Sequence, residues 1–281
     1  MSRNNEDRLG LRVSDTSPPP STKENKFSFT TPTEIVCLPS KGRYYPEGHP
    51  CHNKEEVEIR HMTAKDEDIL SSSALMKKGI AVERFLQNII IDKSIQLDSL
   101  LIGDKNALMV AARITGYGED YDVNVTCPNC YSISQNTFRL DDLEPYCGDE
   151  YEEFGFTATE SGTFMVDMPI SKVTLEITLM TGKDENYLVS QSAINKKKGL
   201  PESTLTDQFA RIIASVDGDS STSKIRSYIN SMPARDSRFL RTNYQKIVPN
   251  IDMKQSFACD TCGWDQEVDV PFTAEFFWPK Q

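Results

Sequence analysis

The sequence predicts a mixed α+β fold in which helices and short antiparallel strands surround two distant cysteine pairs. Segments that alternate apolar and polar residues, as strands do, occur early in the chain and beside both cysteine pairs. Other segments repeat apolar residues at helical spacing. The pairs lie at residues 127–130 and 259–262, each with two residues between its cysteines. At 281 residues the chain can bury a substantial core without a metal or a disulfide.

We expect three regions along the chain. Residues 1–30 mix charged and small polar residues with three consecutive prolines and few large apolar side chains, which predicts a flexible tail. Residues 31–135 and 250–281 are expected to form one α+β domain, because strand patterns lead into a cysteine pair in both segments. Residues 136–249 are then an inserted region of strand and helix.

The first region of order is expected to open with two paired strands. An apolar pattern begins at residues 34–37 and breaks at residues 38–42, where a proline and a glycine occur, which indicates a strand followed by a turn. Val57 and Ile59 alternate with charged residues, as in a half-buried strand. We therefore expect these two strands to pair.

Three helices are predicted next. Thr63 is placed to cap a helix over residues 64–70, whose early acidic residues suit the positive end of the helix dipole. A second amphipathic helix is expected from about Ala81. In a third, Asp104 is expected to accept the first free backbone N–H groups, and Gly116 and Gly118 to end the helix.

The remaining elements surround or separate the cysteine pairs. Residues 121–125 alternate as a strand before the first pair, and residues 173–179 alternate as another. From about 183 to 248 the pattern predicts several helices, the last beginning near Pro233. The final strands, at 256–258 and 268–270, flank the second pair. The aromatic run at 276–279 is expected to close the core rather than to bind a ligand.

The two cysteine pairs carry the strongest chemical signal. Two-residue spacing lets both thiolates of a pair face one ion, and two pairs complete the tetrahedral set that structural zinc prefers. The predicted zinc ligands are Cys127, Cys130, Cys259 and Cys262. Four free thiols, two redox pairs and an iron–sulfur centre are the alternatives, although redox pairs usually open a helix in a βαβ unit. A closed four-cysteine site leaves no open position for catalysis.

Each cysteine pair resembles a rubredoxin-type zinc-ribbon turn. Pro128 lies inside the first turn and Gly263 follows the second, and both suit a tight backbone bend. Residues 131–258 separate the pairs, which is long for a ribbon. The predicted fold is therefore a split four-cysteine zinc ribbon with a mainly helical insertion, whose ends the metal brings together.

The other cysteines and the histidines give weaker signals. Cys37, Cys51 and Cys147 lack the spacing to join the site and are expected to be ordinary thiols. His49 and His52 lie near Cys51 in a loop, an arrangement that seldom binds metal. The odd cysteine count agrees with thiols or metal ligands in a reducing compartment rather than with a disulfide framework.

Composition and motifs disfavour several function classes. A formal net charge of −11 opposes general binding to nucleic acid, and the short basic run at 196–198 fits a solvated loop. No nucleophile elbow, phosphate loop or dinucleotide fingerprint is present. The sequence shows neither a signal peptide nor a membrane span, so we expect synthesis in the cytoplasm.

Five segments, residues 38–46, 63–70, 100–108, 112–119 and 127–130, can be read together, with a less specific extension at 236–241 and 259–262. Together they resemble the T4-type baseplate proteins of contractile-tailed bacteriophages, which include baseplate hub subunits and hub assembly proteins. The resemblance implies a tail-assembly or virion component that is made in the host cytoplasm and binds other baseplate and tail proteins. It transfers no catalytic residues.

The leading hypothesis is thus a non-catalytic baseplate component, a hub subunit or hub assembly factor, with a structural zinc ion. Its partners would be other phage tail proteins and further copies of itself. A zinc-ribbon protein that binds nucleic acid or acts in transcription is the alternative, and an enzyme with an unrecognised site is a third class. The acidic balance disfavours the alternative, since phosphate binding needs clustered Lys and Arg.

Overall fold

The computed structural model describes residues 31–199, 203–271 and 276–278, and the predicted N-terminal tail lies outside them. Its strands are Thr33–Cys37 (β1), Glu56–Arg60 (β2), Asp120–Thr126 (β3), Ile133–Arg139 (β4), Pro145–Tyr146 (β5), Phe156–Ala158 (β6), Phe164–Asp167 (β7), Thr174–Ile177 (β8), Ile213–Val216 (β9), Asn250–Ile251 (β10), Lys254–Ala258 (β11) and Asp265–Asp269 (β12). Its α-helices are Ala64–Ser71 (α1), Ser73–Lys78 (α2), Ala81–Ile89 (α3), Ile102–Tyr117 (α4), Gly182–Lys198 (α5), Thr204–Ile212 (α6), Thr222–Ser231 (α7) and Ala234–Ile247 (α8). Three short 3₁₀ helices are Leu97–Ser99 (η2), Leu140–Asp142 (η3) and Tyr151–Phe154 (η4).

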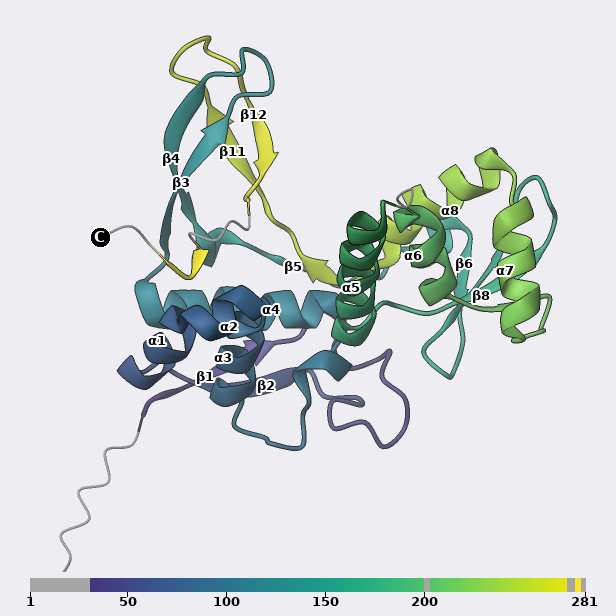
Figure 1. The fold of residues 1–281 in the computed structure, drawn as a ribbon, viewed down its shortest axis with the longest axis horizontal. Helices are drawn as coiled ribbons and strands as arrows, with labels where there is room; N and C mark the ends of the chain where they lie inside the picture. The colour runs from purple at the N-terminus through teal and green to yellow at the C-terminus, as the bar shows by residue number, and fades with distance from the viewer. Residues whose placement is uncertain (1–30, 200–202, 272–275, 279–281) are drawn as a thin grey trace, which may run out of the picture. The chain divides into compact units, whose positions relative to one another are not determined.

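All the strands pair antiparallel, in small sheets (Figure 1). Four sheets have two strands each: β1 with β2, β3 with β4, β5 with β10, and β11 with β12. The fifth sheet has the order β6-β7-β8-β9. The prediction of mixed helices and short antiparallel strands is therefore confirmed. No helix of the described residues is both long and apolar enough to cross a membrane.

The sequence analysis missed several elements. It did not predict α2, β4, β6, β7 or β9. Strand β9 follows α6 directly and is a short buried run, Ile213-Ala214-Ser215-Val216, which periodicity cannot separate from the end of a helix. The described residues of 136–249 thus contain a four-stranded sheet as well as four α-helices, where the sequence indicated a mainly helical insertion.

Helix α4 corrects a second prediction. Asp104 was expected to cap this helix, but it is the third helical residue, and Leu101 occupies the capping position. The buried Asp104 carboxylate instead accepts hydrogen bonds from Ser40 and Tyr45 in the loop after β1. The prediction was wrong because sequence position indicates only which neighbouring backbone N–H groups the Asp104 carboxylate could accept from. The actual donors, Ser40 and Tyr45, are distant in sequence.

A buried aspartate occupies the third position of three helices. These residues are Asp66 in α1, Asp104 in α4 and Asp236 in α8. Asp236 accepts the backbone N–H groups of Ile170 and Ser171, each at 2.8 Å, and so ties α8 to the turn between β7 and β8. Because a buried charge is stable only when it is fully hydrogen-bonded, each aspartate fixes one connection between a helix and the chain around it.

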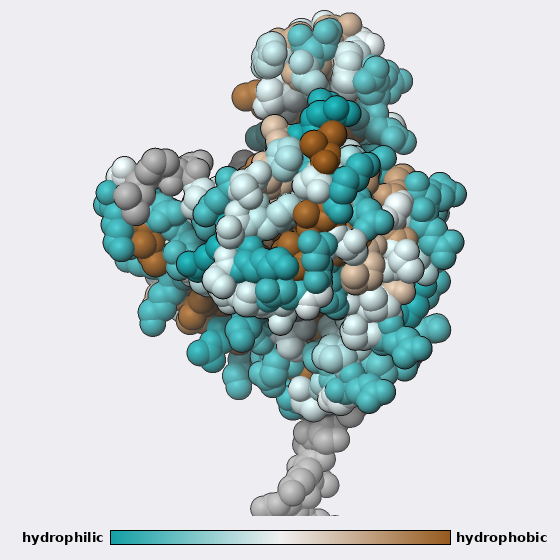
Figure 2. Space-filling view, turned by 90° about the vertical axis from the view of Figure 1, so that its right-hand side faces the viewer, coloured by the Kyte–Doolittle hydropathy of each residue, from teal (hydrophilic) through white to brown (hydrophobic). Residues whose placement is uncertain are grey.

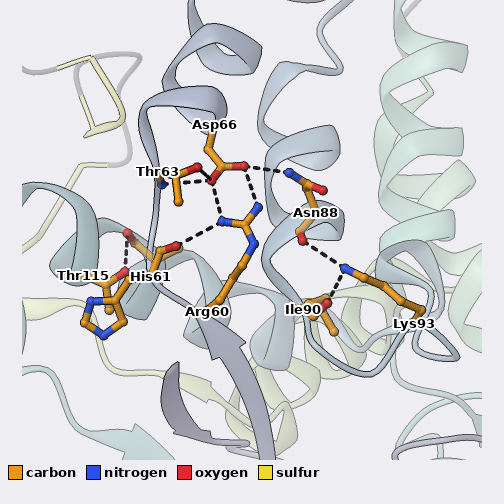
Figure 3. A network of polar contacts seen from close by, with 9 residues as sticks. Arg60, His61, Thr63, Asp66, Asn88, Ile90, Lys93 and Thr115 are labelled. Carbon is orange, nitrogen blue, oxygen red and sulfur yellow. Dashed lines mark hydrogen bonds and ion pairs between the residues drawn. The ribbon is translucent and has the colours of Figure 1, made fainter. Parts of the chain in front are cut away.

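The Asp66 site shows how the predicted cap at Thr63 is built (Figure 3). Thr63 and Asp66 form a reciprocal capping box, and the Thr63 backbone N–H donates to Asp66 Oδ2 at 2.9 Å. Arg60 at the end of β2 adds two hydrogen bonds of 2.6 and 2.9 Å, and Asn88 of α3 adds one of 2.7 Å. A single carboxylate therefore joins β2, α1 and α3.

The core includes aromatic residues from the C-terminal region. Phe276 and Phe277 are buried and meet edge to face, with ring centroids 5.1 Å apart. Phe276 also packs on Tyr121 of β3, and Phe277 on Phe85 of α3. The prediction that this aromatic run closes the core is confirmed for the residues described.

Candidate metal centre

The four cysteines lie in the turns of two β-hairpins. Strands β3 and β4 form the first hairpin, with Cys127 and Cys130 in its turn. Strands β11 and β12 form the second, with Cys259 and Cys262. Figure 1 shows the hairpins side by side with both turns at the same end. The sequence analysis expected a strand before each pair but did not find β4, whose residues are polar apart from Ile133 and the buried Phe138.

The two turns have the same hydrogen-bonding pattern. In the first, Cys127 N–H donates to the Ser132 carbonyl at 2.9 Å, and Tyr131 N–H donates to the Cys127 carbonyl at 2.9 Å. In the second, Cys259 N–H donates to the Trp264 carbonyl at 2.7 Å, and Gly263 N–H donates to the Cys259 carbonyl at 2.9 Å. Each turn therefore holds its two cysteines in the same relative position.

The cysteine sulfur atoms converge. The Cys127 and Cys262 Sγ atoms are 3.8 Å apart, the Cys130 and Cys259 Sγ atoms are 3.7 Å apart, and all four lie within 4.8 Å of one another. These distances are too long for disulfides, whose sulfur atoms are about 2.0 Å apart. Four thiolates about 2.3 Å from one zinc ion in a tetrahedron would be about 3.8 Å apart. The donor set thus fits one tetrahedral metal ion.

The surroundings of the sulfur atoms favour ligand behaviour. The Ser132 hydroxyl lies 2.9 Å from Cys130 Sγ and 3.4 Å from Cys259 Sγ. Its hydrogen bonds lower the pKa of Cys130 and lower that of Cys259 to about 6. Burial raises the pKa of Cys127 to about 11, so this thiol would need a metal to become a thiolate at neutral pH.

Contacts along the two hairpins keep them together beyond the turns. Arg139 in β4 donates its backbone N–H to Gln255 Oε1 in β11 at 3.1 Å, and the Gln255 amide donates back to the Arg139 carbonyl. Tyr121 of β3 donates its hydroxyl to the Pro271 carbonyl at 3.0 Å, just beyond β12. Both contacts lie at the end of the hairpins opposite the turns, and a metal would add a clamp at the turns.

The other candidates from the sequence do not join this site. Within the described residues, the four cysteines are the one group of His, Cys, Asp or Glu side chains that converges closely enough for a metal. The His49 ring is hydrogen-bonded to the Ser99 hydroxyl, and the His52 ring is hydrogen-bonded to the Tyr45 carbonyl. Cys51 is buried, Cys147 is half-buried and Cys37 is exposed.

Comparison with known proteins identifies the family. A family model described as T4 bacteriophage base plate protein matches residues 31–278. The chain belongs to this family. The searches of curated proteins and of solved structures found no match to the chain. The match covers every residue that the structure describes, so the two hairpins and the segment between them belong to one T4-type baseplate protein.

The segments that resembled baseplate proteins in the sequence have structural positions in this fold. Ser40 and Tyr45 bind Asp104, while Asp66 and Asp236 form the two other buried carboxylate sites. Each of these polar groups is hydrogen-bonded to another group of the same chain. These residues of the baseplate segments therefore help to hold the fold together, and the four cysteines are the one group among the described residues that could hold a metal ion.

Proposed function

We propose that this baseplate protein is a non-catalytic hub subunit or hub assembly factor in which a structural zinc ion joins the two hairpins. The convergence of four thiolates from residues 127–130 and 259–262 carries this proposal. Since a site with four cysteine ligands leaves no coordination position for substrate, a metal there would stabilise the fold and not react. Other baseplate and tail proteins are the proposed partners.

In this proposal, the four thiolates would hold the ion, and the ion would supply the energy that keeps the turns together. One iron ion could accept the same four ligands, and the closed site would again be structural. Binding would couple the hairpins across the long intervening segment and would thus stabilise the whole domain.

The nucleic-acid alternative is disfavoured by the hairpins themselves. Their residues, 120–139 and 254–269, include six acidic side chains and two basic ones, Arg139 and Lys254. Arg139 is paired with Glu119 and Asp141. Phosphate binding requires clustered, available cations, which these hairpins lack.

The first test is elemental analysis of the full-length protein and of the Cys127→Ser and Cys259→Ser variants. We expect about one zinc ion per chain, lost in both variants, because each removes a ligand from the same site. Cys37→Ser is the matched control, since Cys37 is exposed and outside the cluster. Retention of metal in either cluster variant would contradict a shared four-ligand site.

The second test concerns the place of the protein in tail assembly. Phage with the gene disrupted should fail to complete baseplates, and complementation by the wild type should restore them. Detection of the chain in purified virions would support a hub subunit. Its absence from virions, together with restored assembly, would support an assembly factor. Normal baseplates without the gene product would refute both forms of the proposal.

A further inference from the structure

The free end of the first hairpin carries two strongly exposed apolar side chains. Tyr131 is 78% exposed and Ile133 is 71% exposed, more than any other large apolar residue in the described part of the chain. Tyr131 directly follows Cys130, and Ile133 begins β4. Exposed aromatic and branched aliphatic residues at one place are typical of protein contacts.

The Tyr131 backbone is held in a conformation that disfavours tyrosine. Its φ is 60°, in the left-handed region, and the equivalent residue of the second turn is Gly263 with φ 68°. Glycine adopts this region freely, whereas a residue with a Cβ pays about 1–2 kcal/mol. The first turn thus keeps an exposed ring at a position where glycine would fold better, and such strain is typical of binding sites.

Ile133 interrupts a polar strand face. It pairs with Thr126 across the hairpin, and the next pairs on that face are Asn124 with Gln135 and Asp122 with Thr137. The surface in Figure 2 is largely hydrophilic, with hydrophobic residues that stand singly or in small groups. Ile133 is therefore an isolated apolar side chain among the polar pairs of this strand face.

The second hairpin, whose turn meets that of the first at the cysteine cluster, carries exposed acidic residues. Asp260 and Asp265 are exposed in and beside the neighbouring turn, and the turns are held together by the contacts of the cysteine cluster. Six acidic and two basic residues give the two hairpins a net charge of −4. A partner that covers Tyr131 and Ile133 would meet this negative charge and would be favoured by basic residues around its apolar centre.

We propose that Tyr131 and Ile133 insert into an apolar depression, rimmed by Lys or Arg, on another baseplate protein. This inference rests on the proposed function and adds the docking surface and the character of the partner. The cysteine cluster would then have a second consequence, because it fixes the backbone from which the tyrosine ring projects. A rigid aromatic anchor loses little conformational entropy on binding.

The test uses baseplate assembly intermediates from cells infected by phage that lack this gene product. The purified full-length protein is added, and cosedimentation is measured for the wild type, Tyr131→Gly, Ile133→Thr and the control Ile35→Thr. Ile35 is a 63% exposed isoleucine in strand β1, so it matches Ile133 in residue type and setting. We expect Tyr131→Gly and Ile133→Thr to bind at least about tenfold more weakly and the control to bind normally.

The variants separate docking from folding. Tyr131→Gly removes the ring and relieves the backbone strain, so weaker binding by a more stable protein with unchanged metal content cannot come from misfolding. Normal binding by both hairpin variants would overturn the docking surface and leave the proposed function intact. Equal losses in Ile35→Thr and Ile133→Thr would also overturn it. Failure of the wild type to cosediment would refute the proposed function and this inference with it.

The basic rim of the partner is tested separately. We expect Asp260→Asn with Asp265→Asn to weaken cosedimentation several-fold at low salt and to reduce its dependence on salt. Tighter binding by this double variant would rule out a basic partner.

Discussion

Ser40 and Asp104 are 64 residues apart in sequence, yet two hydrogen bonds join them in the core. The Ser40 backbone N–H donates to Oδ1 at 3.0 Å, and its hydroxyl donates to Oδ2 at 2.6 Å. Tyr45 adds a third donor at 2.7 Å, and its hydroxyl accepts the Leu101 backbone N–H at 2.9 Å. Burial raises the pKa of Asp104, and these hydrogen bonds oppose the increase because they stabilise the carboxylate.

Tyr45→Phe is expected to lower the free energy of unfolding by about 1–3 kcal/mol. The substitution leaves both Asp104 and the Leu101 N–H short of a buried partner, which costs far more than the lost hydroxyl alone. Urea denaturation measures the change. Tyr44→Phe is the control, since the Tyr44 ring packs on Phe164 and the substitution keeps that ring. Equal effects of the two variants would contradict the role given to the Tyr45 hydroxyl.

Gly103→Ala should destabilise the protein by about 1–3 kcal/mol or more. A Cβ at this position would lie 1.9 Å from the Pro249 carbonyl oxygen, so α4 would have to move away from the segment before β10. Gly116→Ala in the same helix is the comparison, because its Cβ would meet only the flexible Met62 side chain. Thermal unfolding should show a much smaller change there, and a larger loss in Gly116→Ala would contradict the packing argument.

Tyr131→Gly and Gly263→Ala are expected to have opposite effects. The first replaces a strained residue at positive φ and should raise stability by about 0.5–1 kcal/mol, while the second introduces a Cβ at φ 68° and should lower it by about 1 kcal/mol. Both are measured by denaturation of the metal-loaded protein. Changes of the same sign would show that the two turns are not equivalent.

Acid should weaken the fold through Asp66. Burial raises the pKa of Asp66, but hydrogen bonds from Arg60, Thr63 and Asn88 outweigh it and leave the pKa well below its usual range. An Asp with a lowered folded pKa contributes stability above its unfolded pKa of about 4, and this contribution is lost as the pH falls toward the folded value.

Asp66→Asn should therefore cost about 2–3 kcal/mol at pH 7, since Arg60 loses its charged partner, and should flatten the decline in stability below about pH 4. Stability is followed by denaturation between about pH 2 and pH 7. The control is Asp68→Asn, an exposed residue of the same helix, with an expected change within about 0.5 kcal/mol. If the stability of Asp66→Asn declined with acid as it does in the wild type, the Asp66 carboxylate would be excluded as the source of that decline.

Ser132→Ala should weaken metal retention by about 10–100-fold. Its hydroxyl contacts two of the four sulfur atoms, and hydrogen bonds to ligands commonly have effects of this size. Competition with a chelator measures the loss. Ser134→Ala is the control, because the buried Ser134 hydroxyl has no hydrogen-bond partner among the described residues and its removal should be nearly neutral. Equal release from both variants would contradict the role of Ser132.

Much of the cysteine site could be predicted, because its signal is local. Two residues between the cysteines of each pair, at 127–130 and 259–262, allow both thiolates of one turn to bind the same ion. The second pair with the same spacing suggests that the two turns share that ion. The structure brings the four sulfur atoms together, and their role as ligands stays a prediction. Strand β4 could not be predicted in the same way, since its exposed face is polar apart from Ile133 and it is recognised by its pairing with β3.

The sequence by itself determined the family, the mixture of helices and short strands, and the two turns that carry the cysteines. These features depend on residue spacing, periodicity and turn chemistry, which act over a few residues. The tertiary structure decided which distant groups meet. Asp104 binds Ser40 rather than its own helix end, and the two cysteine turns meet although residues 131–258 separate them in sequence. Such contacts depend on burial and on the pairing of polar groups in the core, and a buried polar group takes whichever partner the whole fold brings within reach.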